Sequence, residues 1–168
     1  HRHGLLLEAP LWENMILGHQ TQAPNVKGAL IDAKAAKADT QRVVDEFDVR
    51  TPSIFVTAGS LSGGNQQKLI VGREMSHRPR VLVAAHPTRG VDVGAQAAIW
   101  DLIKDARREG LGVLLISADL EELVGLSDTI RVILRGRLSG EFDPDVVTRE
   151  ELGAAMTGAG AAAEEDVR

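Results

Sequence analysis

The first third of the chain, residues 1–60, has the apolar spacing of helices joined by loops. Apolar side chains recur at helical spacing over residues 11–17, and Gly18 would end that helix. The polar stretch 19–28 predicts a loop, after which Asp32 can cap a second helix. The apolar positions at helical spacing in the two helices are Leu11, Met15, Ile16, Ala36, Val43, Val44 and Phe47.

From about Lys68 onward the pattern changes to helices that alternate with short, continuous apolar runs. Runs of this kind are typical of strands buried on both faces of a parallel sheet. A helix is expected after Gly64 and should end before Pro79. The predicted strands cover residues 81–85, 113–116 and 130–134, and the helices between them cover 95–106 and 119–126. This order predicts an α/β fold with a parallel sheet, and it leaves the first third as a helical subdomain outside that sheet.

The end of the chain predicts a hairpin and one more helix. Residues 135–136 form a tight turn between two extended segments. Thr148, with Glu151 three residues later, has the spacing of a capping box that opens a helix running to Met156. The tail, 158–168, consists of alanine, glycine and acidic residues for the most part, and we expect it to be disordered.

Composition narrows the classes of function. The 168 residues suit one domain of ordinary size, and the net charge of −5 gives no indication of a nucleic-acid partner. No apolar run reaches the length of about 18 residues that a membrane-spanning helix needs. There are no cysteines, and the five histidines lack metal-ligand spacing, so we expect no disulfide and no metal site.

The most informative stretch is Leu61-Ser62-Gly63-Gly64-Asn65-Gln66-Gln67-Lys68, which leads directly into a helix. A serine and two glycines before a helix can bind an anion, because the backbone approaches closely and the first amides of the helix are free. The alternative is a serine-capped helix after a flexible loop, and the tetrapeptide alone does not decide between the two.

The wider context resembles the ATP-binding proteins of ABC transporters, whose signature loop reads Leu-Ser-Gly-Gly before a helix. The stretch from Ala85 to Ala95, Ala-His-Pro-Thr-Arg-Gly-Val-Asp-Val-Gly-Ala, lies where that family has the end of its Walker B strand and its D-loop. Together with Asn65-Gln66-Gln67-Lys68 it is similar to the second ATPase domain of tandem sugar and nucleoside importers. Further similar segments are Arg2-His3-Gly4-Leu5, Glu13-Asn14-Met15-Ile16-Leu17 and Asp48-Val49-Arg50-Thr51-Pro52.

The resemblance implies a partial P-loop NTPase (RecA-like) fold with an ABC helical subdomain and without its Walker A portion. Residues 1–80 would be the helical subdomain with the signature loop and helix, and residues 81–157 the C-terminal part of the RecA-like core. In this family a signature loop completes the nucleotide site of a partner ATPase domain. Residues expected to contact nucleotide in trans are Ser62, Gly63, Gly64, Asn65 and Gln66, and Asp92 of the D-loop would help to align that facing site.

Three departures from the family bear on catalysis. The sequence contains no Gly-x-x-x-x-Gly-Lys-Ser/Thr, so we expect the chain to begin after that element and to lack its own phosphate cradle. The magnesium-supporting Asp falls on Ala85, and the catalytic Glu falls on His86. His86 could act as a base in principle, but without a carboxylate or a P-loop we interpret it as a polar residue at an inactive site. The family's switch His corresponds to Ala118.

These features lead to the hypothesis of an ATPase subunit of an importer for nucleosides or simple sugars, with ATP and magnesium held mainly by a partner ATPase domain. The loss of the Walker B carboxylates favours the nucleoside branch. Such a subunit would be cytoplasmic and peripheral on the inner face of the membrane, would bind permease subunits, and would depend indirectly on a substrate-binding protein. One alternative is a non-catalytic module that docks a permease or a partner ATPase. Another is an ABC ATPase unconnected to transport, which residues 65–68 and 88–95 disfavour.

Overall fold

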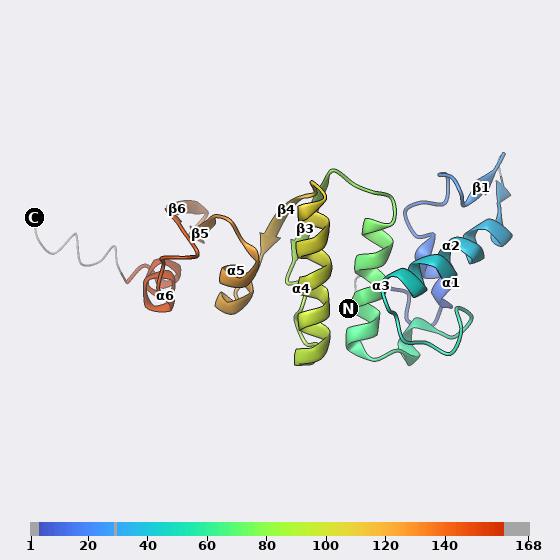
Figure 1. Cartoon of the computed structure of the whole chain (residues 1–168), viewed down its shortest axis with the longest axis horizontal. Helices are drawn as coiled ribbons and strands as arrows, with labels where there is room; N and C mark the ends of the chain where they lie inside the picture. The colour runs from blue at the N-terminus through green and yellow to red at the C-terminus, as the bar shows by residue number, and fades with distance from the viewer. Residues whose placement is uncertain (1–3, 29, 160–168) are drawn as a thin grey trace, which may run out of the picture. The chain divides into compact units, whose positions relative to one another are not determined.

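The computed structural model describes residues 4–28 and 30–159, which form helices and three pairs of strands (Figure 1). They fall into two compact units. The first contains the residues up to Leu82 together with Pro87–Leu114, and the second contains Val83–His86 together with the residues from Leu115 onward. The expected disordered tail lies outside the described residues, apart from the two residues that follow the last helix.

Four helices build the first unit: α1 (Leu11–Met15), α2 (Ala33–Glu46), α3 (Gly63–Met75) and α4 (Val93–Arg108). A short 3-10 turn, Ala58–Ser60, precedes α3. The predicted cap at Asp32 is confirmed, since its carboxylate accepts hydrogen bonds from the backbone amides of Lys34 and Ala35. The core contains side chains from all four helices, and those that are fully buried include Leu11, Val43, Leu69 and Ile99.

A buried polar pair ties the N-terminal segment to this core. The side chain of Asn14 is fully buried, accepts from the backbone amide of Leu6 at 2.8 Å, and donates to the Leu6 carbonyl at 3.0 Å. The guanidinium of Arg73, on α3, donates to the carbonyl oxygens of Gly4 and Asn14 at 3.0 and 3.2 Å. Since buried polar groups are costly when they are unpaired, these bonds fix the segment before α1 against α3.

The expected loop over residues 19–28 is wrong in one respect, because its end forms the first strand of a small hairpin. Strand β1 (Val26–Lys27) pairs with β2 (Leu30–Ile31) in antiparallel register. Two residues per strand are too few to show an alternating pattern in the sequence, so the prediction missed it.

Strands β3 (Val81–Ala85) and β4 (Gly112–Ile116) are hydrogen-bonded neighbours. Backbone bonds join Gly112 to Arg80 at the start of both strands and His86 to Ile116 at the end, so the strands run in the same direction. The expectation that both faces are buried is wrong for this structure. Alternate side chains are exposed, with Val81 at 64%, Val83 at 62% and Leu114 at 56%.

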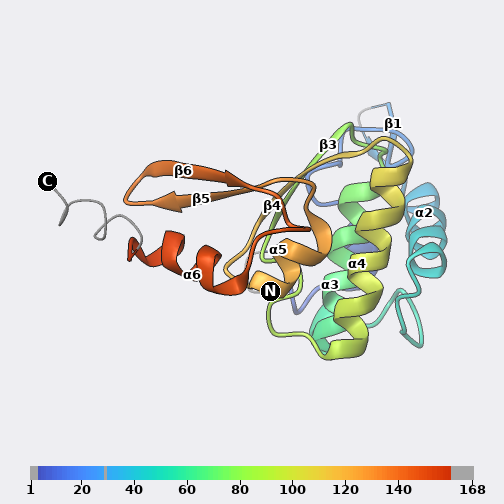
Figure 2. The same cartoon turned by 60° about the vertical axis from the view of Figure 1, so that its left-hand side comes forward.

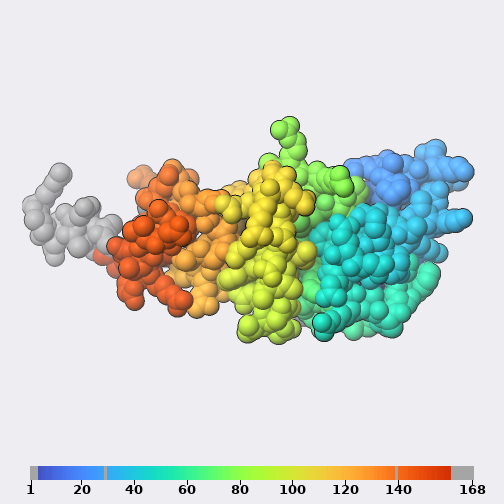
Figure 3. Space-filling model, in the orientation of Figure 1, coloured from blue at the N-terminus to red at the C-terminus, as the bar shows by residue number. Residues whose placement is uncertain are grey.

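The second unit contains α5 (Leu120–Leu126), β5 (Ile130–Leu134), β6 (Arg137–Phe142) and α6 (Arg149–Thr157). The predicted hairpin is confirmed: β5 and β6 pair antiparallel around the turn at 135–136, and β5 is not hydrogen-bonded to β3 or β4. Ile130, Val132 and Leu152 form the core under this hairpin. Figure 2 shows α6 beside the hairpin, and Figure 3 shows β5, β6 and α6 as one contiguous orange-to-red group of atoms.

The capping box that opens α6 is also confirmed. Thr148 accepts from the amide of Glu151 at 3.2 Å, and the Glu151 carboxylate accepts from the amide of Thr148 at 2.8 Å. The hydrogen bonds that the Thr148 amide and the Thr148 hydroxyl donate to the Glu151 carboxylate lower the pKa of that group. Among the described residues, no helix is long and apolar enough to span a membrane.

Candidate functional site

The signature loop forms the N-terminal end of α3. Ser62 has extended backbone angles and is the N-cap, and its Oγ accepts from the backbone amide of Asn65 at 3.4 Å. The amides of Gly63 and Gly64 occupy the first helical positions, and within the described parts of the chain they have no hydrogen-bond acceptor. Free amides at the positive end of a helix dipole favour an anionic ligand, so this end of α3 is suited to an anion.

Gly64 is buried and lies directly against the start of α4. A Cβ at this position would approach the Cβ of Ala95 to 2.5 Å and Oδ2 of Asp92 to 3.6 Å. The second glycine of the signature therefore has a packing role as well as a place in the loop, because it allows the first turns of α3 and α4 to approach each other.

Asp92, the predicted D-loop residue, is the N-cap of α4. Its Oδ1 accepts from the backbone amide of Ala95 at 2.9 Å. The structure thus brings Asp92 next to the signature loop, and the local role of its carboxylate is to cap the helix.

The side chains of Asn65 and Gln66 are bonded within the chain. Oδ1 of Asn65 accepts from the backbone amide of Arg50 at 2.8 Å, and its Nδ2 donates to Oγ of Ser62 at 2.9 Å. Nε2 of Gln66 donates to the carbonyl of Leu61 at 3.0 Å. The expected contact of these two side chains with nucleotide stays a prediction. In this structure their hydrogen bonds stabilise the conformation of the signature loop.

The sequence prediction missed an ion pair at this site. Nζ of Lys68 lies 2.8 Å from Oδ2 of Asp48 and donates to the Asp48 carbonyl at 3.0 Å. The hydrogen bond from Lys68 holds the pKa of the Asp48 carboxyl group below its usual range, and the charge of Arg50 acts in the same direction. The two residues are 20 positions apart, so no local pattern in the sequence indicates the pair.

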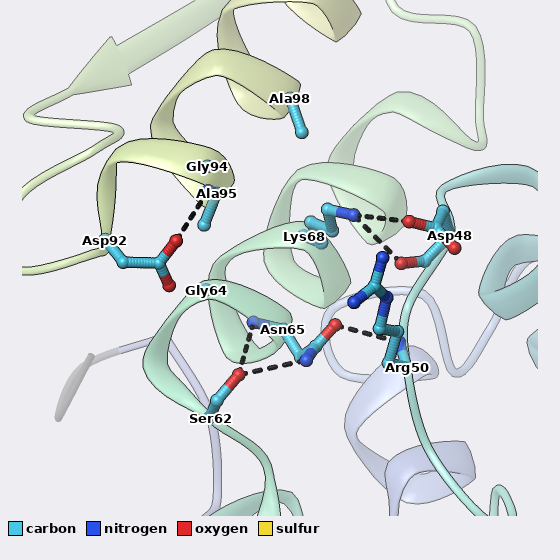
Figure 4. Close-up of a pocket in the computed structure, with 10 residues that line it drawn as sticks. All are labelled: Asp48, Arg50, Ser62, Gly64, Asn65, Lys68, Asp92, Gly94, Ala95 and Ala98. Atoms are coloured by element: carbon cyan, nitrogen blue, oxygen red, sulfur yellow. Dashed lines mark hydrogen bonds and ion pairs between the residues drawn. The ribbon is translucent and has the colours of Figure 1, made fainter.

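These groups line a pocket of about 340 Å³ within the first unit. Figure 4 shows Ser62 and Asn65 on one side, Asp92 and the start of α4 on another, and Asp48 with Arg50 on the third. The residues that line it are Asp48, Arg50, Ser62, Gly64, Asn65, Lys68, Asp92, Gly94, Ala95 and Ala98. Four of the predicted site residues therefore share one concave surface, together with Arg50, whose part in it the sequence did not indicate.

The predicted degenerate positions lie in the second unit. Ala85 ends β3, and His86 follows it with a left-handed backbone (φ 49°) and donates its amide to the carbonyl of Ile116. Ala118 comes two residues after the end of β4, and all three predicted positions are exposed. The part of the chain that the structure describes contains no cluster of histidine or acidic side chains suited to a metal ion. An alanine at 85 offers no oxygen ligand, so this strand end does not fit magnesium.

Curated relatives are similar to the chain over nearly all its length. It is 41% identical over 158 residues to the guanosine import ATP-binding protein NupO of Bacillus subtilis (strain 168), and 42% identical over 158 residues to the nucleoside import ATP-binding protein NupA of Lactococcus lactis subsp. cremoris (strain MG1363). It is 39% identical over 155 residues to the ribose import ATP-binding protein RbsA of Yersinia pestis. These alignments cover 92–94% of this chain, which spans about a third of each relative's length (30–31%).

Solved structures agree on the fold. The dimeric structure of MJ0796, a bacterial ABC transporter cassette, has a TM-score of 0.68 at 19% identity, over 86% of this chain and 60% of that one. A dimeric post-hydrolysis state of the same cassette, bound to ADP and Pi, has a TM-score of 0.64 over 83% and 59%. No protein-family model matches the chain. The predicted partial P-loop NTPase fold is confirmed: the solved structures that share it are ABC transporter cassettes, and the curated proteins similar in sequence are import ATP-binding proteins.

Proposed function

We propose that the chain acts in an importer ATPase, where its signature loop completes a nucleotide site whose P-loop belongs to a partner ATPase domain. The observation that carries this proposal is the contrast between two positions. The end of α3 presents the Ser62 hydroxyl and the free amides of Gly63 and Gly64, whereas the strand end at 85–86 has lost the carboxylates that hydrolysis in cis would need.

In this arrangement Ser62, Gly63 and Gly64 would contact the terminal phosphate of ATP and would stabilise its negative charge through hydrogen bonds and the helix dipole. Asp92 would set the position of the loop at the edge of the facing site, because it caps the helix against which Gly64 packs. Magnesium, held with the nucleotide mainly by the partner domain, would neutralise phosphate charge there.

The class of substrate follows from the relatives. Those most similar in sequence include import proteins for guanosine, nucleosides and ribose, so we favour a nucleoside, with a simple sugar as the second choice. The remaining partners would be permease subunits and, through them, a substrate-binding protein, with the chain on the cytoplasmic face of the membrane. The competing function is a module that docks a permease or an ATPase without taking part in hydrolysis.

The test is ATP hydrolysis by the assembled importer with three variants of this chain. The arginine side chain of Ser62→Arg would fill the pocket at the end of α3. We expect this variant to abolish hydrolysis. Ala85→Asp restores one carboxylate, but His86 still stands in place of the catalytic Glu, so turnover should change little. Gln67→Arg adds the same side chain to the same helix as a control, and it should retain activity.

Undiminished turnover in Ser62→Arg would contradict the proposal. If that variant still co-purified with the permease subunits at the normal level, the non-catalytic module would be the better account.

A further inference from the structure

We propose that Asn65 is a positioning residue, which holds the Ser62 hydroxyl as a hydrogen-bond donor directed at a phosphate group. This inference rests on the proposed function, because it requires Ser62 to meet a phosphate. It assigns to Asn65 a role that acts through its neighbour and not through its own contact with nucleotide.

The first step is the orientation of the Asn65 amide. The backbone amide of Arg50 lies 2.8 Å from one end of the Asn65 side chain. A backbone N–H can only donate, so the atom that faces it must be the oxygen, Oδ1. This contact removes the usual ambiguity between the oxygen and the nitrogen of a side-chain amide.

The second step follows from the first. With Oδ1 facing Arg50, the other end of the amide is the NH₂ group, and it lies 2.9 Å from Oγ of Ser62. An NH₂ group can only donate, so the serine oxygen must accept. The same oxygen also accepts the backbone amide of Asn65 at 3.4 Å, as the cap of α3. Both lone pairs of the serine oxygen are then in use, and only its proton remains available for a further bond.

The third step concerns what that proton can meet. Ser62 is exposed, and within residues 4–28 and 30–159 its hydroxyl has no acceptor. A ligand at this position must therefore bring an acceptor, as a phosphate oxygen does, and a ligand that brings a donor would find no partner. Together with the free amides of Gly63 and Gly64, the Ser62 proton gives the end of α3 three hydrogen-bond donors.

The fourth step explains how the amide keeps its orientation. The loop that supplies the Arg50 amide also supplies Asp48, whose carboxylate and carbonyl bind the largely buried Lys68 on α3. The loop is thus attached to the first two turns of α3 at positions 65 and 68. This attachment places the Arg50 amide where it can fix the side chain of Asn65.

The test is a double-mutant cycle on phosphate binding by the 168-residue chain. The amide signals of Gly63 and Gly64 are followed by two-dimensional NMR while inorganic phosphate is added at constant ionic strength. Ser62→Ala should weaken binding about tenfold, as expected for the loss of one hydrogen bond to a charged group. Asn65→Ala should weaken binding about three- to fivefold when Ser62 is present, and should have no further effect in the Ser62→Ala background.

Asn65→Asp is a second test, because it changes the shape of the side chain very little. It keeps an oxygen for the Arg50 amide, but it replaces the NH₂ group by an oxygen that would accept the Ser62 proton. We expect phosphate binding to fall at least as far as in Ser62→Ala. The same change in the Ser62→Ala background measures the charge repulsion alone and should be smaller. Gln67→Ala, on the same helix, is the control and should leave the affinity unchanged.

The two proposals fail in different ways. Equal losses from Asn65→Ala in both backgrounds would overturn the positioning role while leaving the phosphate site in place. Unchanged binding in Ser62→Ala, or no phosphate-dependent shift at Gly63 and Gly64, would overturn the phosphate contact on which the proposed function depends.

Discussion

At the scale of single residues, Gly64 shows how one position can serve both packing and binding. Its amide is among the free donors at the end of α3, while its missing side chain leaves room for Ala95 on α4. A binding loop that is also a helix contact has little freedom to move, which preserves the directions of its donors.

We therefore expect Gly64→Ala to destabilise the chain. The new Cβ would lie 2.5 Å from the Cβ of Ala95, and neither methyl group can rotate away, so the two helices must separate. Forced overpacking of this kind costs about 1–3 kcal/mol. Chemical denaturation followed by circular dichroism measures the change in the free energy of unfolding.

Gly153→Ala is the matched control for Gly64→Ala. Gly153 lies inside α6, and a Cβ there has no neighbour within 4 Å. Replacing glycine by alanine in an open helix position should stabilise by about 0.5–1 kcal/mol. If both variants shifted stability in the same direction, the packing role of Gly64 would be wrong.

At the scale of elements, the ion pair between Asp48 and Lys68 joins the loop after α2 to α3. Lys68 is largely buried near the positive end of its helix, where a cation needs compensation, and the carboxylate of Asp48 supplies it. The pair therefore links the position of the 48–50 loop to the helix that carries the signature.

This link should depend on pH. The pKa of Asp48 is lowered in the folded chain by the hydrogen bond from Lys68. Its contribution to stability is thus fully present above the unfolded pKa of about 3.9, and it is lost as the pH falls through the lower, folded value. We expect Asp48→Asn to reduce the free energy of unfolding at pH 7 and to have much less effect at pH 3. Asparagine also tolerates the left-handed backbone at this position (φ 47°).

Urea unfolding at the two pH values measures this difference. Asp101→Asn on α4 is the control, since within the described residues its carboxylate makes no ion pair or hydrogen bond. Its small effect on stability should be similar at pH 7 and pH 3. A pH-independent effect of Asp48→Asn would show that the ion pair does not connect the loop to α3.

Local signals in the sequence were enough for most of the elements. The caps at Asp32 and Thr148 and the turn at 135–136 depend on residues within three positions of one another, and each formed as predicted. The hydrogen bonds of Asn65 to Arg50 and of Lys68 to Asp48 depend on tertiary packing across 15 and 20 positions, and no periodicity predicts them.

At the scale of the whole molecule, the apolar runs identified the strands but not their environment. An apolar strand has the same sequence whether a layer covers one of its faces or both. In this structure alternate residues of β3 and β4 are exposed. Exposed apolar side chains of this kind favour contact with further protein.

The central claim is that Ser62 faces a nucleotide held by another ATPase domain. Because the chain contains no cysteine, Ser62→Cys introduces a single thiol at that position. The most direct measurement is labelling of this thiol by an ATP analogue with an alkylating group on its terminal phosphate, mapped by peptide mass spectrometry, with Gln67→Cys as the control. The account predicts that labelling at position 62 rises strongly when the partner ATPase domain is present. Equal labelling without that domain, or equal labelling of Gln67→Cys, would contradict it.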